Sequence, residues 1–164
     1  YWIVLSKLIA ATLTAMVQAI LLLVLLLVLG LVSVKVALSL LLPAVLTAIC
    51  CAAIGGLIAV YSKSIDNFAV IMNFFIFPVF FLSGALYPVN QLPDYLHYIV
   101  LVNPFSYGVD LLKHAVPNVP TDFSVVTDIA VLLSFSIVAI AIACWQFSRE
   151  SVHEPLFHRA TKRG

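Results

Sequence analysis

Charged residues are scarce in this chain: Lys and Arg number 8, Asp and Glu number 7, and together they make up 9% of the sequence. A soluble domain needs a charged, mixed surface, and about a quarter of its residues carry charge. The composition therefore excludes a soluble protein of this length. Hydrophobic residues fill 64% of the chain, and the mean hydropathy is +1.19. We expect an integral membrane protein.

The sequence also lacks the features that are typical of several functional classes. The sequence has no G-x-x-x-x-G-K-[ST] motif, so we do not expect it to hydrolyse ATP. It has no basic patch large enough to bind nucleic acid. Its two central histidines have no catalytic partner at a helical spacing, which disfavours an intramembrane enzyme. The three cysteines fall in apolar segments and predict neither a disulfide framework nor a metal site. These residues are His97, His114, Cys50, Cys51 and Cys144.

Four apolar segments are long enough to cross a bilayer, which takes about 20 mostly apolar residues. They are residues 8–31, 36–60, 68–86 and 129–147. We therefore predict an all-α integral membrane protein, with four transmembrane helices in a single transmembrane domain, 1–164. In the second segment small residues recur every four positions, at Ala44, Ala48, Ala52 and Gly56, and this pattern favours close helix packing. Asp66 or Asn67 is expected to cap the third helix.

The distribution of Lys and Arg predicts the orientation. If the four spans alternate, most basic residues fall on one side, and only two fall on the other. The first group is Lys7, Lys63, Arg149, Arg159, Lys162 and Arg163, and the second is Lys35 and Lys113. The positive-inside rule then puts both termini in the cytoplasm. Residues 148–164 are predicted to form a cytoplasmic tail, whose basic residues favour anionic membrane lipids.

The most informative segment precedes the last span, where prolines interrupt the apolar pattern. The third span breaks at Pro78, at Ser83-Gly84 and at Pro88, and two short amphipathic pieces follow. Asn103 can cap the second piece, with Pro104 at its first position. Each piece is too short to span a membrane, and the segment's tyrosines suit a membrane interface. We predict a re-entrant or interfacial helical hairpin at residues 88–116, on the external side.

The order and spacing of four motifs resemble a known family. The motifs are P-x-x-F-L-S-G-x-x-[FY]-P, L-P-x-[WY]-L, N-P-[FLI]-[ST]-Y and D-x-L-[RK], at residues 78–88, 92–96, 103–107 and 110–113. The chain resembles the C-terminal two-thirds of the permease subunit of type-2 ABC exporters, the ABC-2 family. That family has six spans. Because the sequence begins at Tyr1 without an initiator Met, we expect the missing pair and a cytoplasmic coupling helix to precede it.

The resemblance implies a homodimeric permease of a bacterial or archaeal cell membrane. It would work with a separate ABC ATPase subunit, which binds ATP and Mg²⁺, and would export an amphipathic, lipid-linked, glycan or drug-like substrate. No catalytic residue is expected. Candidate pathway residues are Gln18, Asn73 and Ser83, and candidate residues of an external gate are Tyr95, Tyr98, Asn103, Tyr107 and Lys113. Lys113 stands where the family more often has Arg, and it lacks the guanidinium's fork geometry.

Two other functions stay open. A secondary transporter usually carries ionisable residues within its spans, but none lies between Lys7 and Lys35 or between Asp66 and Asp94. A membrane scaffold without transport activity gives no reason for the proline-broken third span. For each candidate residue, packing or interfacial anchoring is the alternative role. The sequence does not identify the substrate.

Overall fold

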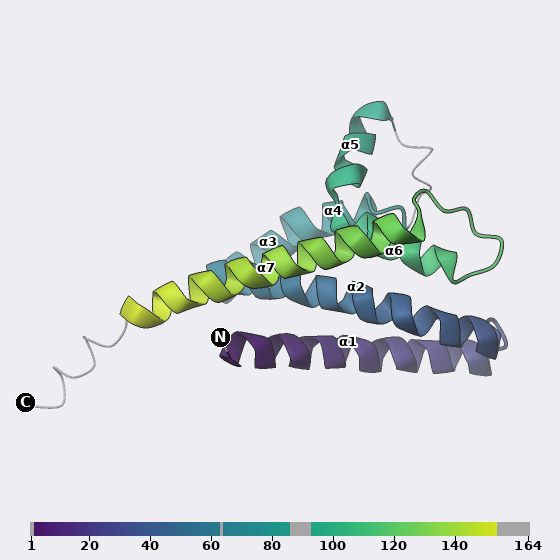
Figure 1. Ribbon diagram of the computed structural model, residues 1–164, viewed down its shortest axis with the longest axis horizontal. Coiled ribbons are helices and arrows are strands. Elements are labelled where there is room, and N and C mark those ends of the chain that lie inside the picture. Colours follow the sequence, from purple (N-terminus) through teal and green to yellow (C-terminus); the bar gives the residue numbers. More distant parts are fainter. Residues whose placement is uncertain (1, 63, 86–92, 154–164) are drawn as a thin grey trace, which may run out of the picture.

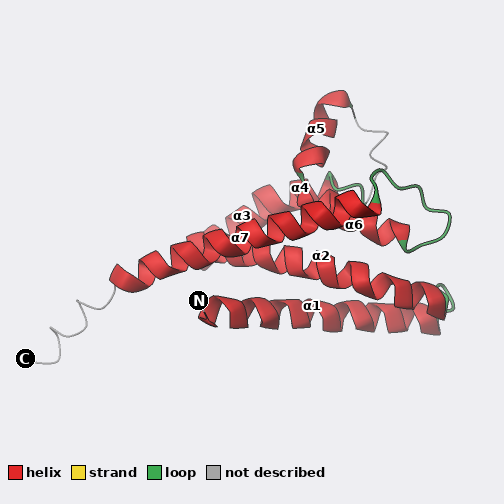
Figure 2. Ribbon diagram, in the orientation of Figure 1, coloured by secondary structure: helices red, strands yellow, loops and turns green. Residues whose placement is uncertain are grey.

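The computed structural model describes residues 2–62, 64–85 and 93–153, and every regular element in these ranges is a helix (Figure 2). This confirms the prediction of an all-α protein. In chain order the elements are α1 (Trp2–Val28), α2 (Val34–Tyr61), α3 (Ile65–Ile71), the π-helix η1 (Met72–Ile76), α4 (Phe77–Phe81), α5 (Asp94–Val102), α6 (Pro104–His114) and α7 (Val125–His153).

Three helical segments in the described ranges are long and apolar enough to cross a membrane. They are Val4–Val28, Val34–Tyr61 and Val125–Ser148. The predicted third span, 68–86, corresponds to the shorter apolar run Asp66–Phe81, and its last residue lies outside the described ranges. The predicted span 68–86, and with it the total of four spans, therefore stays a prediction. α7 contains the predicted span 129–147 and continues into the first residues of the predicted tail, while residues 154–164 are not described.

α2 lies at the centre of the bundle and packs against both α1 and α7 (Figure 1). α6 lies along α2 and the first half of α7. The start of α1 and the end of α7 are at one end of the bundle, and the loops 29–33 and 115–124 are at the other. An even number of passes between the termini would give this arrangement.

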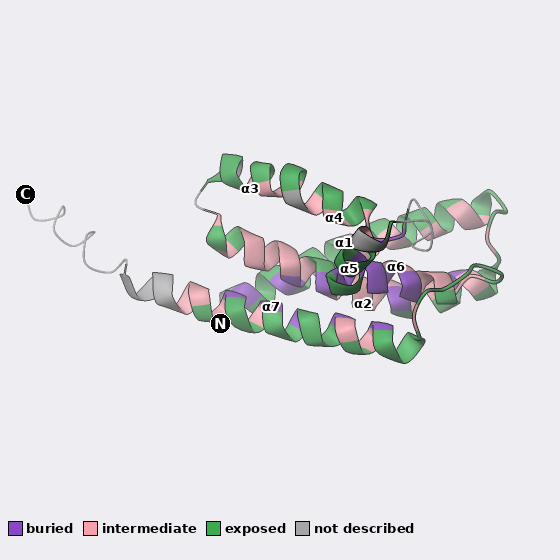
Figure 3. Ribbon diagram, turned by 90° about the horizontal axis from the view of Figure 1, so that it is seen from above, coloured by how far each residue is buried: buried purple, intermediate pink, exposed green. Residues whose placement is uncertain are grey.

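Two apolar clusters hold these helices together, as the purple segments of Figure 3 indicate. The first joins α1, α2 and α7 through Val4, Leu8, Ala53, Ala139 and Ala143. The second joins α2, α6 and α7 through Cys50, Tyr107, Leu111 and Leu132. Elsewhere α1 exposes mostly Leu, Ile and Val. In a bilayer acyl chains would cover this surface, and the helix satisfies its own backbone hydrogen bonds.

The third apolar segment is irregular because of Pro78. Proline has no N–H to donate to the carbonyl one turn earlier, and the preceding turn is widened: the Phe77 N–H bonds to the carbonyl of Met72, five residues back. Asn73 lies in this π-helical turn. The helix ends at Phe81, and Gly84 follows with a φ of +79°, a conformation that favours glycine. The predicted irregularities near Pro78 and Ser83-Gly84 are thus both present.

The start of α3 differs from the sequence expectation. The cap is Ser64, whose hydroxyl oxygen accepts a bond from the Asn67 N–H at 3.2 Å. Asp66 and Asn67 therefore lie inside the first turn, and the prediction that one of them caps this helix is wrong. Asp66 still carries negative charge near the helix N-terminus, where the helix dipole favours it.

Candidate functional site

α5 and α6 form a bent pair joined at Asn103, and this residue fixes the position of the bend. Its side-chain oxygen accepts a bond from the Phe105 N–H at 3.0 Å, which caps α6, and Pro104 occupies the first helical position. Its amide nitrogen donates to the carbonyl of Val79 in α4 at 2.8 Å. The predicted cap is therefore confirmed. Asn103 also ties the bend to the third apolar segment, a contact that the sequence did not indicate.

Tyr107 strengthens the same bend one turn further along α6. Its hydroxyl donates to the carbonyl of Leu101 in α5 at 2.7 Å. Its ring stacks on Phe123 with a centroid distance of 4.7 Å. Burial raises the pKa of the Tyr107 phenol above its ordinary value, and the carboxylate of Asp128 raises it further. The hydroxyl is therefore a neutral donor at physiological pH.

A close approach of α6 and α2 places α6 in the bundle. Gly108 faces Thr47, and a Cβ atom at Gly108 would lie only 2.8 Å from the Thr47 methyl carbon. Glycine is therefore needed for this spacing. α5, by contrast, rises away from the bundle (Figure 1) and exposes apolar side chains such as Val102.

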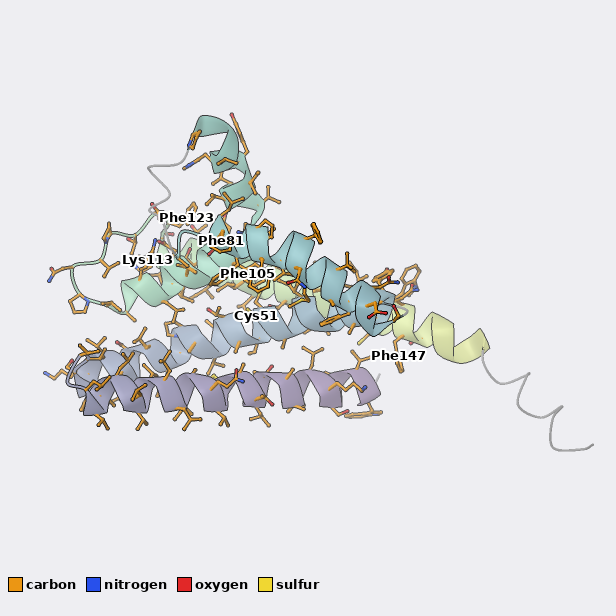
Figure 4. All side chains as sticks on the ribbon, turned by 180° about the vertical axis from the view of Figure 1, so that it is seen from behind. Cys51, Phe81, Phe105, Lys113, Phe123 and Phe147 are labelled. Carbon is orange, nitrogen blue, oxygen red and sulfur yellow. The ribbon has the colours of Figure 1, made fainter. Side chains whose placement is uncertain are left out.

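Asp110 is buried in α6 and holds the loop that leads to α7. One carboxylate oxygen accepts a bond from the Asp122 N–H at 2.8 Å, and the other accepts from the Phe123 N–H at 2.9 Å. Hydrogen bonds to a charged acceptor are stronger than neutral ones. The side chain thus organises the loop 115–124 around α6. In Figure 4, Lys113 and Phe123 lie together at this end of the bundle, far from Phe147.

Two further titratable side chains meet Asp110, and we call the three residues the Asp110 cluster: Asp110, His114 and Asp128. The Nε2 atom of His114 lies 3.6 Å from an oxygen of Asp110 and 3.6 Å from an oxygen of Asp128. It lies 3.0 Å from the carbonyl oxygen of Phe123. Asp128 is fully buried, in the first turn of α7. Carboxylate and imidazole groups in this arrangement are potential metal ligands.

A mainly apolar cavity of about 260 Å³ adjoins the cluster. α2 contributes Ser39, Leu42, Pro43 and Leu46, and α6 and α7 contribute Leu111, His114, Val125 and Ile129. The Ser39 hydroxyl also donates to the carbonyl of Ala115, at 3.1 Å, which fixes the start of the loop against α2. His114 is therefore the side chain through which the cavity meets the cluster.

The three predicted pathway residues lie in separate elements. Gln18 is exposed on α1, which packs against α2 and α7. Asn73 is exposed on η1, and its amide donates to the carbonyl of Ala69 at 2.8 Å. Ser83 is buried after α4, and its hydroxyl donates to the carbonyl of Phe80. The last two side chains bond to backbone carbonyls four and three residues earlier in the chain, and a role in transport stays a prediction for all three.

The predicted gate residues lie on α5, on α6 and at the bend between these helices. Asn103 and Tyr107 are buried at the bend, whereas Tyr98 is 74% exposed on α5. Tyr95 belongs to α5, but its side chain lies outside the described residues. Lys113 pairs with Asp122 at 3.5 Å, with both side chains partly exposed. The structure thus brings Asn103 and Tyr107 together, while a gating role stays a prediction for all five.

Sequence reasoning missed the Asp110 cluster, although the sequence indicates the proximity of two of its three residues. Asp110 and His114 are four residues apart, a spacing that places both on one face of a helix. Asp128 is the only acidic residue between Ser124 and Phe147 in an otherwise apolar run, directly before the predicted span 129–147. Nothing local in the sequence indicated that the loop 115–124 would bring it to the other two.

Comparison with known proteins gives a family match and several relatives. The family model described as "ABC-2 type transporter" matches residues 1–116. The chain is 29% identical over 92 residues to "Nodulation protein J" of Rhizobium leguminosarum bv. viciae, an overlap of 56% of this chain and 35% of that protein. It is 31% identical over 94 residues to "Inner membrane transport permease YadH" of Escherichia coli K12, 57% of this chain and 36% of that protein.

The matched part thus spans about a third of these relatives, at 35% and 36% of their lengths. No solved structure gave a significant match.

Proposed function

The chain belongs to the ABC-2 type transporter family, and from this premise we propose that it is the membrane-spanning permease subunit of an ATP-driven exporter. The observation that carries the proposal is the α5–α6 pair, which lies just before the last candidate span, with α6 buried against α2 and α7 and α5 projecting from them. A pair of short helices, one packed along the bundle and one projecting from its side, suits a protein that opens and closes a path. A simple anchor has no use for it.

We propose that two permease copies work with two copies of a separate ATPase, which binds ATP and Mg²⁺. Closure of the ATPase pair would push on cytoplasmic loops and tilt the spans, and the α5–α6 pair would respond at the external side. Such a lid motion needs one well-fixed part and one free part. The hydrogen bonds of Asn103 and Tyr107 fix the bend, and the exposed face of α5 around Tyr98 is free among the described residues.

The proposal for the substrate names a broad class of molecules and no single compound. An amphipathic, lipid-linked, glycan or drug-like molecule would suit the aromatic third segment, where Phe74, Phe77, Phe80 and Phe81 are exposed. Gln18, Asn73 and Ser83 remain the proposed pathway residues. Asp128 is the one acidic residue within the three candidate spans, and it lies in the first turn of α7. An ionisable group at a helix end does not favour ion-coupled secondary transport, which uses such groups deeper in the membrane.

The first test measures whether ATP hydrolysis by a partner ATPase depends on this permease. The full-length permease is expressed with the ATPase encoded beside it, purified through a tag on the permease, and reconstituted in liposomes. We expect the ATPase to co-purify and its hydrolysis to rise several-fold when the permease and a transported lipid, glycolipid or drug are both present. An ATPase whose Walker lysine is replaced serves as the control. Hydrolysis that never depends on the permease would refute the exporter.

The second test concerns orientation. We propose that both ends of the described chain face the cytoplasm and that the loop 115–124 faces outward. Reporters that are active on only one side of the membrane are fused after Gly164 and inserted at Asn118, an exposed loop residue with a φ of 62°. We expect opposite signals at the two positions. Signals from the same side would contradict the proposed number of spans. They would not change the conclusion from the test of ATPase dependence.

A further inference from the structure

The Asp110 cluster contains a buried acid, Asp128, whose carboxylate has no hydrogen-bond partner among the described residues. We propose that Asp110, His114 and Asp128 bind a first-row divalent transition-metal cation, of which Zn²⁺ is the best match, where α6 meets the first turn of α7. The site is independent of the transport proposal, because it depends only on the geometry of these three side chains and the loop between the two helices.

Asp128 provides the observation that points to a ligand. It is 0% exposed, and among the described residues neither of its carboxylate oxygens has a hydrogen-bond partner. Its 3.6 Å separation from His114 is too long for a hydrogen bond. A buried carboxylate is tolerated when it is paired or coordinates a metal. One of these oxygens lies 3.6 Å from the His114 Nε2 atom, and the three potential ligand atoms of the cluster lie within 4.8 Å of one another.

Basic side chains do not supply the missing charge. Lys113 is the only Lys or Arg between Ser64 and Ser148, and it pairs with Asp122 on the partly exposed side of the loop. His114 can carry one positive charge when protonated, but two carboxylates face it. A divalent cation bound to a neutral imidazole would balance both carboxylates, and metal ligation requires that neutral form.

The spacing of the donor atoms fits a small coordination sphere. Ligands about 2.0–2.2 Å from a tetrahedral zinc lie about 3.3–3.6 Å from one another. The His114 Nε2 atom is 3.6 Å from each carboxylate, and the three potential ligand atoms lie within 4.8 Å of one another. The carbonyl oxygen of Phe123, 3.0 Å from Nε2, accepts a hydrogen bond from the protonated form of that nitrogen. When the metal binds, Nε2 gives up this proton and ligates the cation, and the ligand atoms, now within 4.8 Å of one another, move closer together.

The surroundings also resemble those of a prepared metal site. The backbone N–H groups of Asp122 and Phe123 orient the Asp110 carboxylate, and such outer contacts hold metal ligands in place. Mixed imidazole and carboxylate donors suit Zn²⁺ or Mn²⁺, whereas Mg²⁺ and Ca²⁺ prefer oxygen donors alone. The cavity that His114 lines offers a route of entry. The bound cation would clamp α6 to α7 and close the loop 115–124.

The test is metal binding by the full-length permease, purified in detergent through a tag without histidines and stripped with a chelator. It is dialysed against Zn²⁺, and bound metal is counted by mass spectrometry. We expect one Zn²⁺ per wild-type chain and a rise in melting temperature. Asp128→Asn and His114→Gln should bind at least tenfold more weakly and show no such rise. Asp66→Asn and His97→Gln are matched controls at exposed positions, and they should behave as the wild type does.

The variants also separate folding from binding. His114 is partly exposed, so His114→Gln should elute as a folded protein even if Asp128→Asn does not. Equal zinc binding by the wild type and His114→Gln overturns the proposal. A wild type that binds no zinc overturns the proposal equally, whatever the melting temperature of Asp128→Asn.

Discussion

Replacing Asp110 by Ala is expected to lower the free energy of unfolding by about 3–5 kcal/mol, because the change removes two charge-assisted hydrogen bonds at once and each is worth about 1.5–3 kcal/mol. The Asp122 and Phe123 N–H groups, now bonded at 2.8 Å and 2.9 Å, would lose their acceptor. The loop 115–124 would then open. We expect a lower melting temperature in detergent and faster proteolysis within this loop, both measured with a chelator present so that bound metal plays no part.

Two variants of the same region sharpen this test. Asp110→Asn keeps one acceptor oxygen, but its amide would face the other N–H, so we expect an intermediate loss. Asp122→Asn removes only the 3.5 Å pair with Lys113, and a partly exposed pair contributes at most about 1 kcal/mol. If Asp110→Ala and Asp122→Asn melt at the same temperature, the carboxylate of Asp110 does not hold the loop.

The sequence predicted the parts of the fold that local chemistry controls. Asn103 followed by Pro104 is a local signal for the start of a helix, because the Asn amide can cap the helix and proline suits its first turn. The break between α5 and α6 therefore falls where the sequence predicted it. The irregularity near Pro78 was predictable for the same reason, since proline lacks the N–H that a regular helix needs.

Packing between distant segments was harder to predict. The small-residue pattern in α2 was expected to bring helices close together, yet a Cβ at Gly56 would meet nothing within 4 Å among the described residues. A close approach on α2 instead involves Thr47, opposite Gly108, 61 residues away in the chain. Which face of an apolar helix meets a neighbour depends on all its neighbours, and lipid and protein favour the same side chains in a membrane.

The candidate site also has one part that the local sequence predicts and one part that depends on contacts between distant segments. The four-residue spacing of Asp110 and His114 places them on one helix face, but the approach of Asp128 depends on the path of the loop 115–124. That path is set by the Asp110 carboxylate, by Ser39 and by the stacking of Phe123 on Tyr107. None of these contacts leaves a periodic pattern. A lone acid at the start of an apolar run is a signal for such a site only once its neighbours are known.

Replacing Asn103 by Ala is the second change with a large expected effect, a loss of about 2–3 kcal/mol in the free energy of unfolding. A lost helix cap costs about 1 kcal/mol, and a partly buried carbonyl left without its donor costs about 1–2 kcal/mol, the lower part of the range for buried groups. The cap is the bond from the Phe105 N–H, and the carbonyl is that of Val79. α6 would also lose its tie to α4. We expect a lower melting temperature and, under the proposed export function, weaker coupling of transport to ATP hydrolysis.

Asn103→Asp separates the two contributions. The carboxylate can still accept the Phe105 N–H and cap α6, but it cannot donate to the Val79 carbonyl and would repel it, so the tie between α6 and α4 is lost while the cap remains. We expect a melting temperature between those of the wild type and Asn103→Ala. Asn67→Ala, at an exposed position on α3, should stay within about 0.5 kcal/mol of the wild type. If Asn103→Asp has the same melting temperature as the wild type, the bond to Val79 contributes nothing to stability. The bend would then be held by the helix cap and by Tyr107 alone.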